Sequence, residues 1–164
     1  MTVARVLVTG MSGVGKSTAL SHLERLGYRV VDTDWPGWAE EVAADGGRTE
    51  QLWLEEPMTA LLSEPMDQHL FVSGCVANQV SFYDRFDSIF LLTAPLDVML
   101  ERIDARADNL FGKSSDDRRR IVDDVTVVEP LLRTGASHVI DATRSVDDVV
   151  GALVGIAESS RGAV

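Results

Sequence analysis

The stretch of sequence that decides the fold is Gly10-Met11-Ser12-Gly13-Val14-Gly15-Lys16-Ser17. It matches every position of the Walker A pattern, G-x-x-x-x-G-K-[ST]. The β-branched and aliphatic run Arg5 to Thr9 precedes it, and leucines at helical spacing follow it. Because the pattern requires a strand before the loop and a helix after it, the sequence predicts a phosphate-binding loop within an α/β fold.

Phosphate binding is the chemistry that this loop predicts. Its glycines let successive backbone amides point inward, and the N-terminus of the following helix favours an anion. We expect Lys16 to reach the β- and γ-phosphates of ATP and the Ser17 hydroxyl to bind Mg²⁺. The alternative, a glycine-rich turn that binds nothing, is disfavoured because motif and context agree. The residues expected to contact ATP are Ser12, Gly13, Val14, Gly15, Lys16, Ser17 and Thr18.

Strand-like and helix-like runs alternate along the 164 residues, which predicts an α/β fold of one domain spanning 1–164. Short apolar runs at 28–31, 70–73, 89–93 and 139–141 are typical of further buried strands. The segment 35–65 is interrupted by proline and glycine, and we expect helices hinged over a site there.

Composition narrows the function. A net charge of −11 disfavours a broad surface for duplex nucleic acid. No apolar stretch is long enough to span a bilayer, so we expect no membrane partner. The chain opens directly into the strand-like run at 3–8 without a secretory signal, which favours a cytoplasmic location. A single cysteine, Cys75, excludes a disulfide within one chain. The oligomeric state stays open.

Two acidic residues follow the second expected strand. The third strand ends without the acid of a Walker B motif, whereas Asp32 and Asp34 stand two apart and project to one side of an extended chain. At the carboxyl edge of a parallel sheet they would face the phosphates. One could help to hold Mg²⁺ while the other accepts the proton of an acceptor hydroxyl. A polar strand end that caps the next turn is the alternative.

Together, the Walker A loop, this Asp-x-Asp and the short length resemble the shikimate kinase, gluconate kinase and nucleoside monophosphate kinase group of P-loop folds. The resemblance covers nearly the whole chain. It implies a three-layer fold with a five-stranded parallel sheet, a substrate-binding helical segment at 35–69 and a lid at about 107–117. By the same match Asp32 takes the Mg²⁺ role and Asp34 the substrate role.

Arginines are expected to close the site from the lid. Arg102 and Arg106 stand four apart on an expected helix and share one face. A guanidinium can grip phosphate oxygens and offset charge that develops during transfer. A solvated helix face paired with Glu101 and Asp104 is the alternative. In the turn after the last strand, which by resemblance wraps the adenine, Arg144 is a candidate stacking partner.

The resemblance departs from shikimate kinases at the acceptor site. Those enzymes carry an arginine for the substrate carboxylate where this chain has Val128. Shikimate is therefore disfavoured. Residues after the third strand are expected to line the acceptor pocket, although a capped turn is as good a reading: Ser73, Gly74 and Asn78.

These features predict an ATP-dependent, Mg²⁺-assisted kinase for a small-molecule acceptor, with Lys16, Asp34, Arg102 and Arg106 as catalytic residues. A nucleoside or nucleotide kinase, with base-recognition helices in 35–65, is one alternative. The other is an ATP-binding regulatory module whose hydrolysis is incidental.

Overall fold

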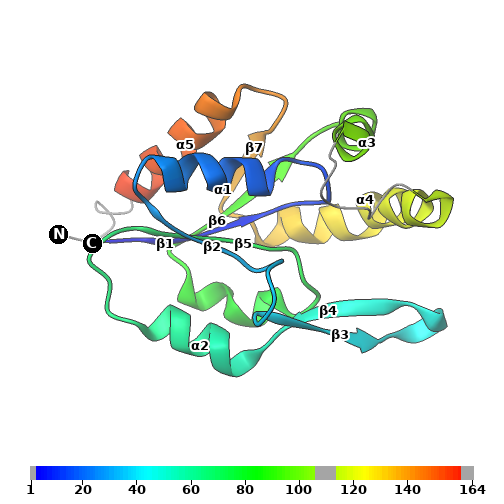
Figure 1. Ribbon diagram of the computed structural model, residues 1–164, viewed down its shortest axis with the longest axis horizontal. Helices are drawn as coiled ribbons and strands as arrows, with labels where there is room; N and C mark the ends of the chain where they lie inside the picture. The colour runs from blue at the N-terminus through cyan, green and yellow to red at the C-terminus, as the bar shows by residue number, and fades with distance from the viewer. Residues whose placement is uncertain (1–2, 106–113, 160–164) are drawn as a thin grey trace.

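The centre of the fold is a parallel sheet of five strands in the order β2-β5-β1-β6-β7 (Figure 1). The computed structural model describes residues 3–105 and 114–159. In register, Leu7 of β1 lies between Val72 of β5 and Ile89 of β6. The expected fold class is confirmed. The strands are β1 Arg5–Thr9, β2 Arg29–Asp32, β5 Leu70–Ser73, β6 Ser88–Thr93 and β7 His138–Asp141.

Both faces of the sheet are covered, which gives three layers. Successive side chains of a strand point to opposite faces. Val6 and Val8 therefore pack with helices α1 (Lys16–Arg25) and α5 (Val146–Ser159), while Leu7 packs with α2 (Glu55–Ser63). The central strands β1, β5 and β6 are buried on both sides and need continuous apolar sequence, which explains why short apolar runs were sufficient to predict them.

The elements that can form a site lie together at the carboxyl end of the sheet. Helix α3 (Leu96–Ala105), helix α4 (Ser115–Gly135) and the ribbon β3–β4 all extend from this end, at the right of Figure 1. Helix α4 begins where the Ser114 hydroxyl accepts a hydrogen bond from the Asp117 backbone N–H at 3.1 Å. Arg106 and residues 107–113 of the expected lid lie outside the described residues.

The segment 35–69 differs from expectation. Its first half is an antiparallel hairpin, β3 (Ala39–Ala43) and β4 (Thr49–Trp53), and only its second half is helical. Between the strands, a short 3₁₀ turn, η1 (Asp45–Gly47), places Gly46 and Gly47 at φ of 73° and 72°. These left-handed values suit glycine and turn the chain back. The prediction of helices over this half was therefore wrong.

Two helical segments complete the architecture. Pro57, one of the prolines that interrupt the segment 35–65, lies in the first turn of α2, where a proline removes no intrahelical hydrogen bond. The 3₁₀ helix η2 (Gln79–Arg85) leads from the loop after β5 towards β6. Within the described residues, no helix is both long and apolar enough to cross a membrane.

Candidate nucleotide and acceptor site

The loop between β1 and α1 is shaped by two glycines that no other residue could replace without strain. Gly10 has φ of +152° and Gly13 of +84°. A Cβ on Gly10 would lie 2.6 Å from the Leu92 carbonyl oxygen, and one on Gly13 would lie 2.6 Å from that of Met99. Both distances are far below van der Waals contact. The loop therefore sits directly against the end of β6 and against α3.

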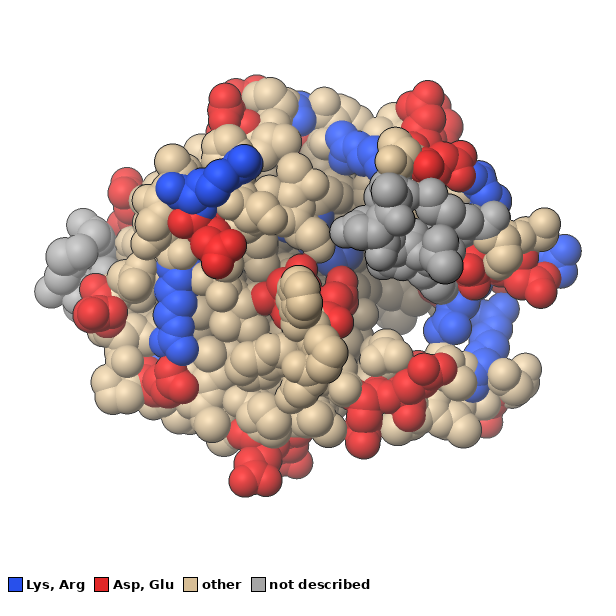
Figure 2. Space-filling view, in the orientation of Figure 1, with Lys and Arg blue, Asp and Glu red and all other residues tan. Residues whose placement is uncertain are grey.

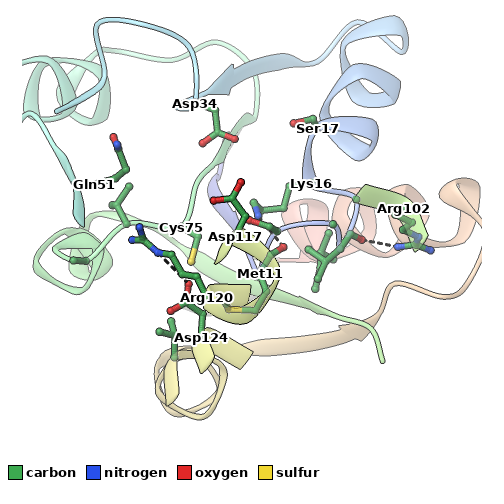
Figure 3. Close-up of a pocket in the computed structure, with 18 of the residues that line it drawn as sticks. Met11, Lys16, Ser17, Asp34, Gln51, Cys75, Arg102, Asp117, Arg120 and Asp124 are labelled. Carbon is green, nitrogen blue, oxygen red and sulfur yellow. Dashed lines mark hydrogen bonds and ion pairs between the residues drawn. The ribbon is translucent and has the colours of Figure 1, made fainter. Parts of the chain in front are cut away.

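Lys16 reaches back across this loop. Its Nζ donates hydrogen bonds to the Gly10 carbonyl at 2.6 Å and to the Met11 carbonyl at 3.2 Å. Figure 3 shows the side chain near the middle of the cavity. A single ammonium held over a curled glycine loop at a helix N-terminus is the arrangement that binds the phosphates of a nucleotide.

Ser17 and Asp32 form the second part of the site. The Ser17 hydroxyl donates to Asp32 Oδ2 at 3.0 Å, and the backbone N–H of Asp34 donates to Asp32 Oδ1 at 3.0 Å. The two bonds orient the carboxylate toward the first turn of α1. A hydroxyl and one carboxylate, completed by phosphate oxygens and water, are the ligands that Mg²⁺ takes in such sites. The residues present therefore fit this ion.

A cavity of about 1500 Å³ connects these groups. Its walls come from the phosphate loop, the hairpin β3–β4, the loop after β5, helices α3 and α4, and the turn after β7. Figure 2 shows the surface hollowed beside the hairpin. Asp34 is exposed and points into this space, so the structure brings it together with Lys16 and Ser17 (Figure 3).

Comparison with known proteins agrees with this geometry. The family model of the AAA domain (AAA_18) matches residues 6–123, which is more than half of the chain. The chain belongs to this family, in the P-loop small-molecule kinase group.

Individual relatives divide into two kinds. A shikimate kinase 2 of Yersinia enterocolitica is 30% identical over 88% of this P-loop domain and 90% of the relative. A nucleotide-binding protein of Limosilactobacillus reuteri is 32% identical over 84% of the domain, which spans only 47% of that relative. The chain thus spans about half the length of such relatives. A solved shikimate kinase from Bacteroides thetaiotaomicron has the same fold, with a TM-score of 0.66, 19% identity and coverage of 96% and 99% of the two chains.

Arg102 lies beneath the phosphate loop of this P-loop domain. Its Nη1 donates to the Val14 carbonyl at 2.9 Å and its Nη2 to the Ala142 carbonyl at 2.7 Å. The guanidinium thereby ties the loop to the turn after β7. Arg106, its expected companion, lies outside the described residues. The expected phosphate grip of Arg102 stays a prediction, whereas the contacts give it a positioning role.

The turn after β7 is held by its own side chains. Asp141 Oδ1 accepts hydrogen bonds from the Thr143 hydroxyl at 2.6 Å and from the Thr143 backbone N–H at 2.9 Å. These bonds favour the ionised carboxylate and lower the pKa of Asp141. Arg144 is exposed on the cavity wall, with its Nε 3.8 Å from Asp148 Oδ2. A fixed turn of this kind can present backbone groups to a base.

Ser73, Gly74 and Asn78, expected in the acceptor pocket, lie behind its wall. Ser73 is buried, and its carbonyl accepts from the Thr33 hydroxyl at 2.7 Å. A Cβ on Gly74 would approach the same hydroxyl to 2.3 Å. The Asn78 amide bonds the backbone N–H and carbonyl of Trp53, at 2.8 and 3.1 Å. These contacts hold β2, β4 and the loop after β5 together, and none of the three expected residues lines the cavity.

Cys75 follows directly and does reach the cavity (Figure 3). Burial raises the pKa of its thiol, although nearby Lys16 opposes the shift. The thiol is therefore protonated at neutral pH, which fits a small packing residue better than a nucleophile.

Sequence reasoning missed the side chains that form the outer wall. Asp117, Arg120 and Asp124 line the cavity from the face of α4 that also carries Val128, which the resemblance had already placed at the acceptor site, and Gln51 lines it from β4. The spacing of three and four residues on α4 was a signal that could have identified this face. Gln51 gave no such signal, because its position depends on a hairpin that the sequence did not predict.

Proposed function

We propose that the chain transfers the γ-phosphoryl group of ATP, with Mg²⁺, to a hydroxyl group of a small-molecule acceptor. One observation carries the proposal: Lys16, Ser17 and Asp34 face one another across a single cavity that extends beyond the phosphate loop to α4 and the hairpin. A domain that only held a nucleotide would not need this further space. The shikimate kinase 2 relative, similar along nearly its full length, supports the same reaction class.

Each residue has a distinct part in this reaction. The backbone amides of the loop and Lys16 bind the phosphates and stabilise their charge. Ser17 and Asp32 would hold Mg²⁺, which neutralises charge on the phosphate oxygens when bound. Asp34 orients the acceptor hydroxyl and takes its proton.

The bonds balance as an in-line displacement. The acceptor oxygen forms a bond to the γ-phosphorus, and the bond from that phosphorus to the β,γ-bridging oxygen breaks. ADP leaves with the bridging oxygen, and the hydroxyl proton passes to the Asp34 carboxylate. Arg102 keeps the loop in place through Val14 and Ala142 and so preserves the alignment that such a transfer needs.

The test is a screen of hydroxyl compounds in which ADP formation is followed with ATP and Mg²⁺. We expect an acceptor that raises ADP formation and appears as a phosphorylated product by mass spectrometry. Lys16→Ala should reduce acceptor-dependent turnover by about 100-fold or more, because it removes the phosphate-binding cation. Arg25→Ala, a charge removed from the exposed end of α1, is the control and should keep turnover.

A regulatory module that binds ATP is the second candidate. The relatives named only as nucleotide-binding proteins favour it, since the chain spans 47–50% of their length and the remainder could read out the nucleotide state. ADP formation that no acceptor raises, but that Lys16→Ala removes, would favour this candidate and reject the kinase.

A further inference from the structure

The cavity divides into two halves on either side of Lys16. Arg102 and Arg144 border the half next to the turn after β7, where the nucleotide would extend. The other half, here called the acceptor half, is walled by Asp34 in the turn after β2, the hairpin β3–β4, the loop after β5 and α4. Figure 3 shows Gln51, Cys75, Arg120 and Asp124 in this half, across Lys16 from Arg102.

Carboxylates dominate the acceptor half. Among the residues that the structure describes, its cationic side chains are Arg48 and Arg120. Figure 2 shows acidic side chains over the hairpin, next to the hollow. An anionic acceptor would enter a negative field that ATP makes still more negative. The acidic residues of this half are Asp34, Glu41, Asp45, Glu50, Asp117 and Asp124.

Both arginines are already engaged by the protein. Arg120 Nη2 donates to the Thr49 carbonyl at 2.5 Å, and its Nε lies 3.9 Å from Asp124 Oδ2. Arg48 Nη2 lies 3.1 Å from Asp123 Oδ2. A carboxylate or phosphate of an acceptor would have to displace these partners and then lie beside Asp124. The arginines therefore serve to join α4 to the hairpin.

Asp124 is a partly enclosed carboxylate of α4 that lines the acceptor half. Its side chain is 31% exposed, and burial raises its pKa while Arg120 opposes the shift. One turn further along α4, Val128 presents an apolar surface to the same cavity. A hydroxyl or ammonium donor stabilises a partly desolvated carboxylate beside an apolar wall by a hydrogen bond, whereas an anion is repelled by it.

We propose that the acceptor is a small polyhydroxy compound, uncharged or bearing an amine, that carries no carboxylate or phosphate group. Asp124, neutralising Arg120, is the residue that sets this specificity. The inference rests on the proposed function and deepens it. It stands on three observations: the excess of carboxylates among the described lining residues, the engagement of Arg48 and Arg120, and the apolar Val128.

Matched compounds test the proposal. Glucose, glucosamine and glucuronate differ in charge on one ring, and adenosine and AMP differ by one phosphate. We expect the uncharged or amine member of a set to exceed its anionic partner by about 10-fold or more in kcat/KM, because like charges repel in a confined site. A preference for glucuronate or AMP would overturn the inference and leave the kinase standing. If neither these compounds nor the wider screen of hydroxyl compounds raises ADP formation, the proposed function fails and the inference falls with it.

Two variants with opposite expected effects test whether Asp124 and Arg120 set the preference against anionic acceptors. Asp124→Asn removes the negative charge beside Arg120 while the Thr49 contact stays, so the anionic-to-uncharged ratio of kcat/KM should rise by about 5-fold or more. Arg120→Gln should lower it, because Asp124 then faces the acceptor alone. Glu129→Gln is the matched control. Glu129 also pairs with an arginine four residues away, Arg133, at 3.3 Å, but it lies outside the cavity wall.

Thermal unfolding and ATP affinity of each variant show whether it is folded. Unchanged ratios in both folded cavity variants would overturn the role of Asp124. The same would follow if Glu129→Gln changed the ratio as much as Asp124→Asn does. If one cavity variant fails to fold, the other still tests the role of Asp124, because the change expected in its anionic-to-uncharged ratio has a definite direction.

Discussion

The phosphate loop requires glycine at position 13, because there is no room for a Cβ there. Gly13→Ala would place a methyl group 2.6 Å from the Met99 carbonyl oxygen at φ of +84°. We expect a loss of about 1–3 kcal/mol in the free energy of unfolding, and a much weaker affinity for ATP. Denaturant unfolding and calorimetric ATP titration measure the two effects.

A matched glycine gives the opposite result. Gly151 lies within α5, and a Cβ there would meet nothing within 4 Å. Gly151→Ala should therefore leave ATP affinity intact and raise stability by about 0.5–1 kcal/mol. If Gly13→Ala were as harmless as Gly151→Ala, the close approach of the loop to α3 would be wrong.

Substitutions of Arg102 can distinguish a role in positioning the phosphate loop from a direct catalytic role. Without its bonds to the Val14 and Ala142 carbonyls, Arg102→Ala should lose about 1–3 kcal/mol of stability. We also expect about 10-fold weaker ATP binding, because loop and turn no longer stay aligned. Arg102→Lys keeps the charge but cannot span both carbonyls, so it should behave like the alanine variant.

Steady-state kinetics separate the two roles. A positioning role raises the KM for ATP, whereas a grip on the transferring phosphoryl group lowers kcat at saturating ATP. A variant with reduced kcat, unchanged KM and full stability would restore the phosphate-gripping role that sequence analysis predicted for Arg102.

The hairpin β3–β4 shows where sequence reasoning reached its limit at the scale of elements. Ala39-Glu40-Glu41 and Glu50-Gln51 are helix formers, and local propensity argued for helices. Contacts distant in sequence decided otherwise: Asn78 binds both backbone groups of Trp53, and the Ala77 N–H donates to the Gln51 carbonyl at 3.0 Å. Strand preference depends on such partners, which one sequence does not reveal.

Asn78 should therefore be important for the stability of this hairpin. Asn78→Ala leaves the Trp53 N–H and carbonyl without their partners in a partly buried place, at a cost of about 1–3 kcal/mol. Hydrogen exchange should accelerate first in β4 and less in the central sheet. Ser81→Ala, at an exposed neighbouring position, is the control. Uniform acceleration across β1, β5 and β6 would contradict a local role.

Across the whole molecule, the parts of the site that were predictable from sequence are those formed by residues close together in the chain or joined by the parallel sheet. The loop, Lys16 and Ser17 belong to one contiguous motif, and Asp32 joins them because β2 and β5 carry it to the same sheet edge in register with Ser73. Sequence pattern and parallel topology were sufficient for these residues. The acceptor half unites a hairpin, a loop and α4, whose relation depends on tertiary contacts such as Arg120 with Thr49. Periodicity identifies such a helix face but not what lies opposite it.

Linkage between ligand binding and folding tests the two parts of the nucleotide site together. A ligand that binds only the folded state at 100 times its Kd stabilises that state by about 2.7 kcal/mol. We expect ATP with Mg²⁺ to raise the melting temperature, and excess EDTA to remove part of that increase. Asp32→Asn weakens the Ser17 and Asp32 pair, so its ATP-induced increase should be smaller and nearly insensitive to EDTA.

The control for this linkage is Asp97→Asn, an exposed carboxylate in the first turn of α3 outside the cavity wall. It removes the same charge yet should keep the full dependence on Mg²⁺. Equal EDTA sensitivity in Asp32→Asn and Asp97→Asn would place the ion elsewhere. Lys16→Ala should lose the increase with or without EDTA, because the phosphates themselves are then poorly held. The order of effects thus separates the residue that binds the phosphates from the pair that binds the ion.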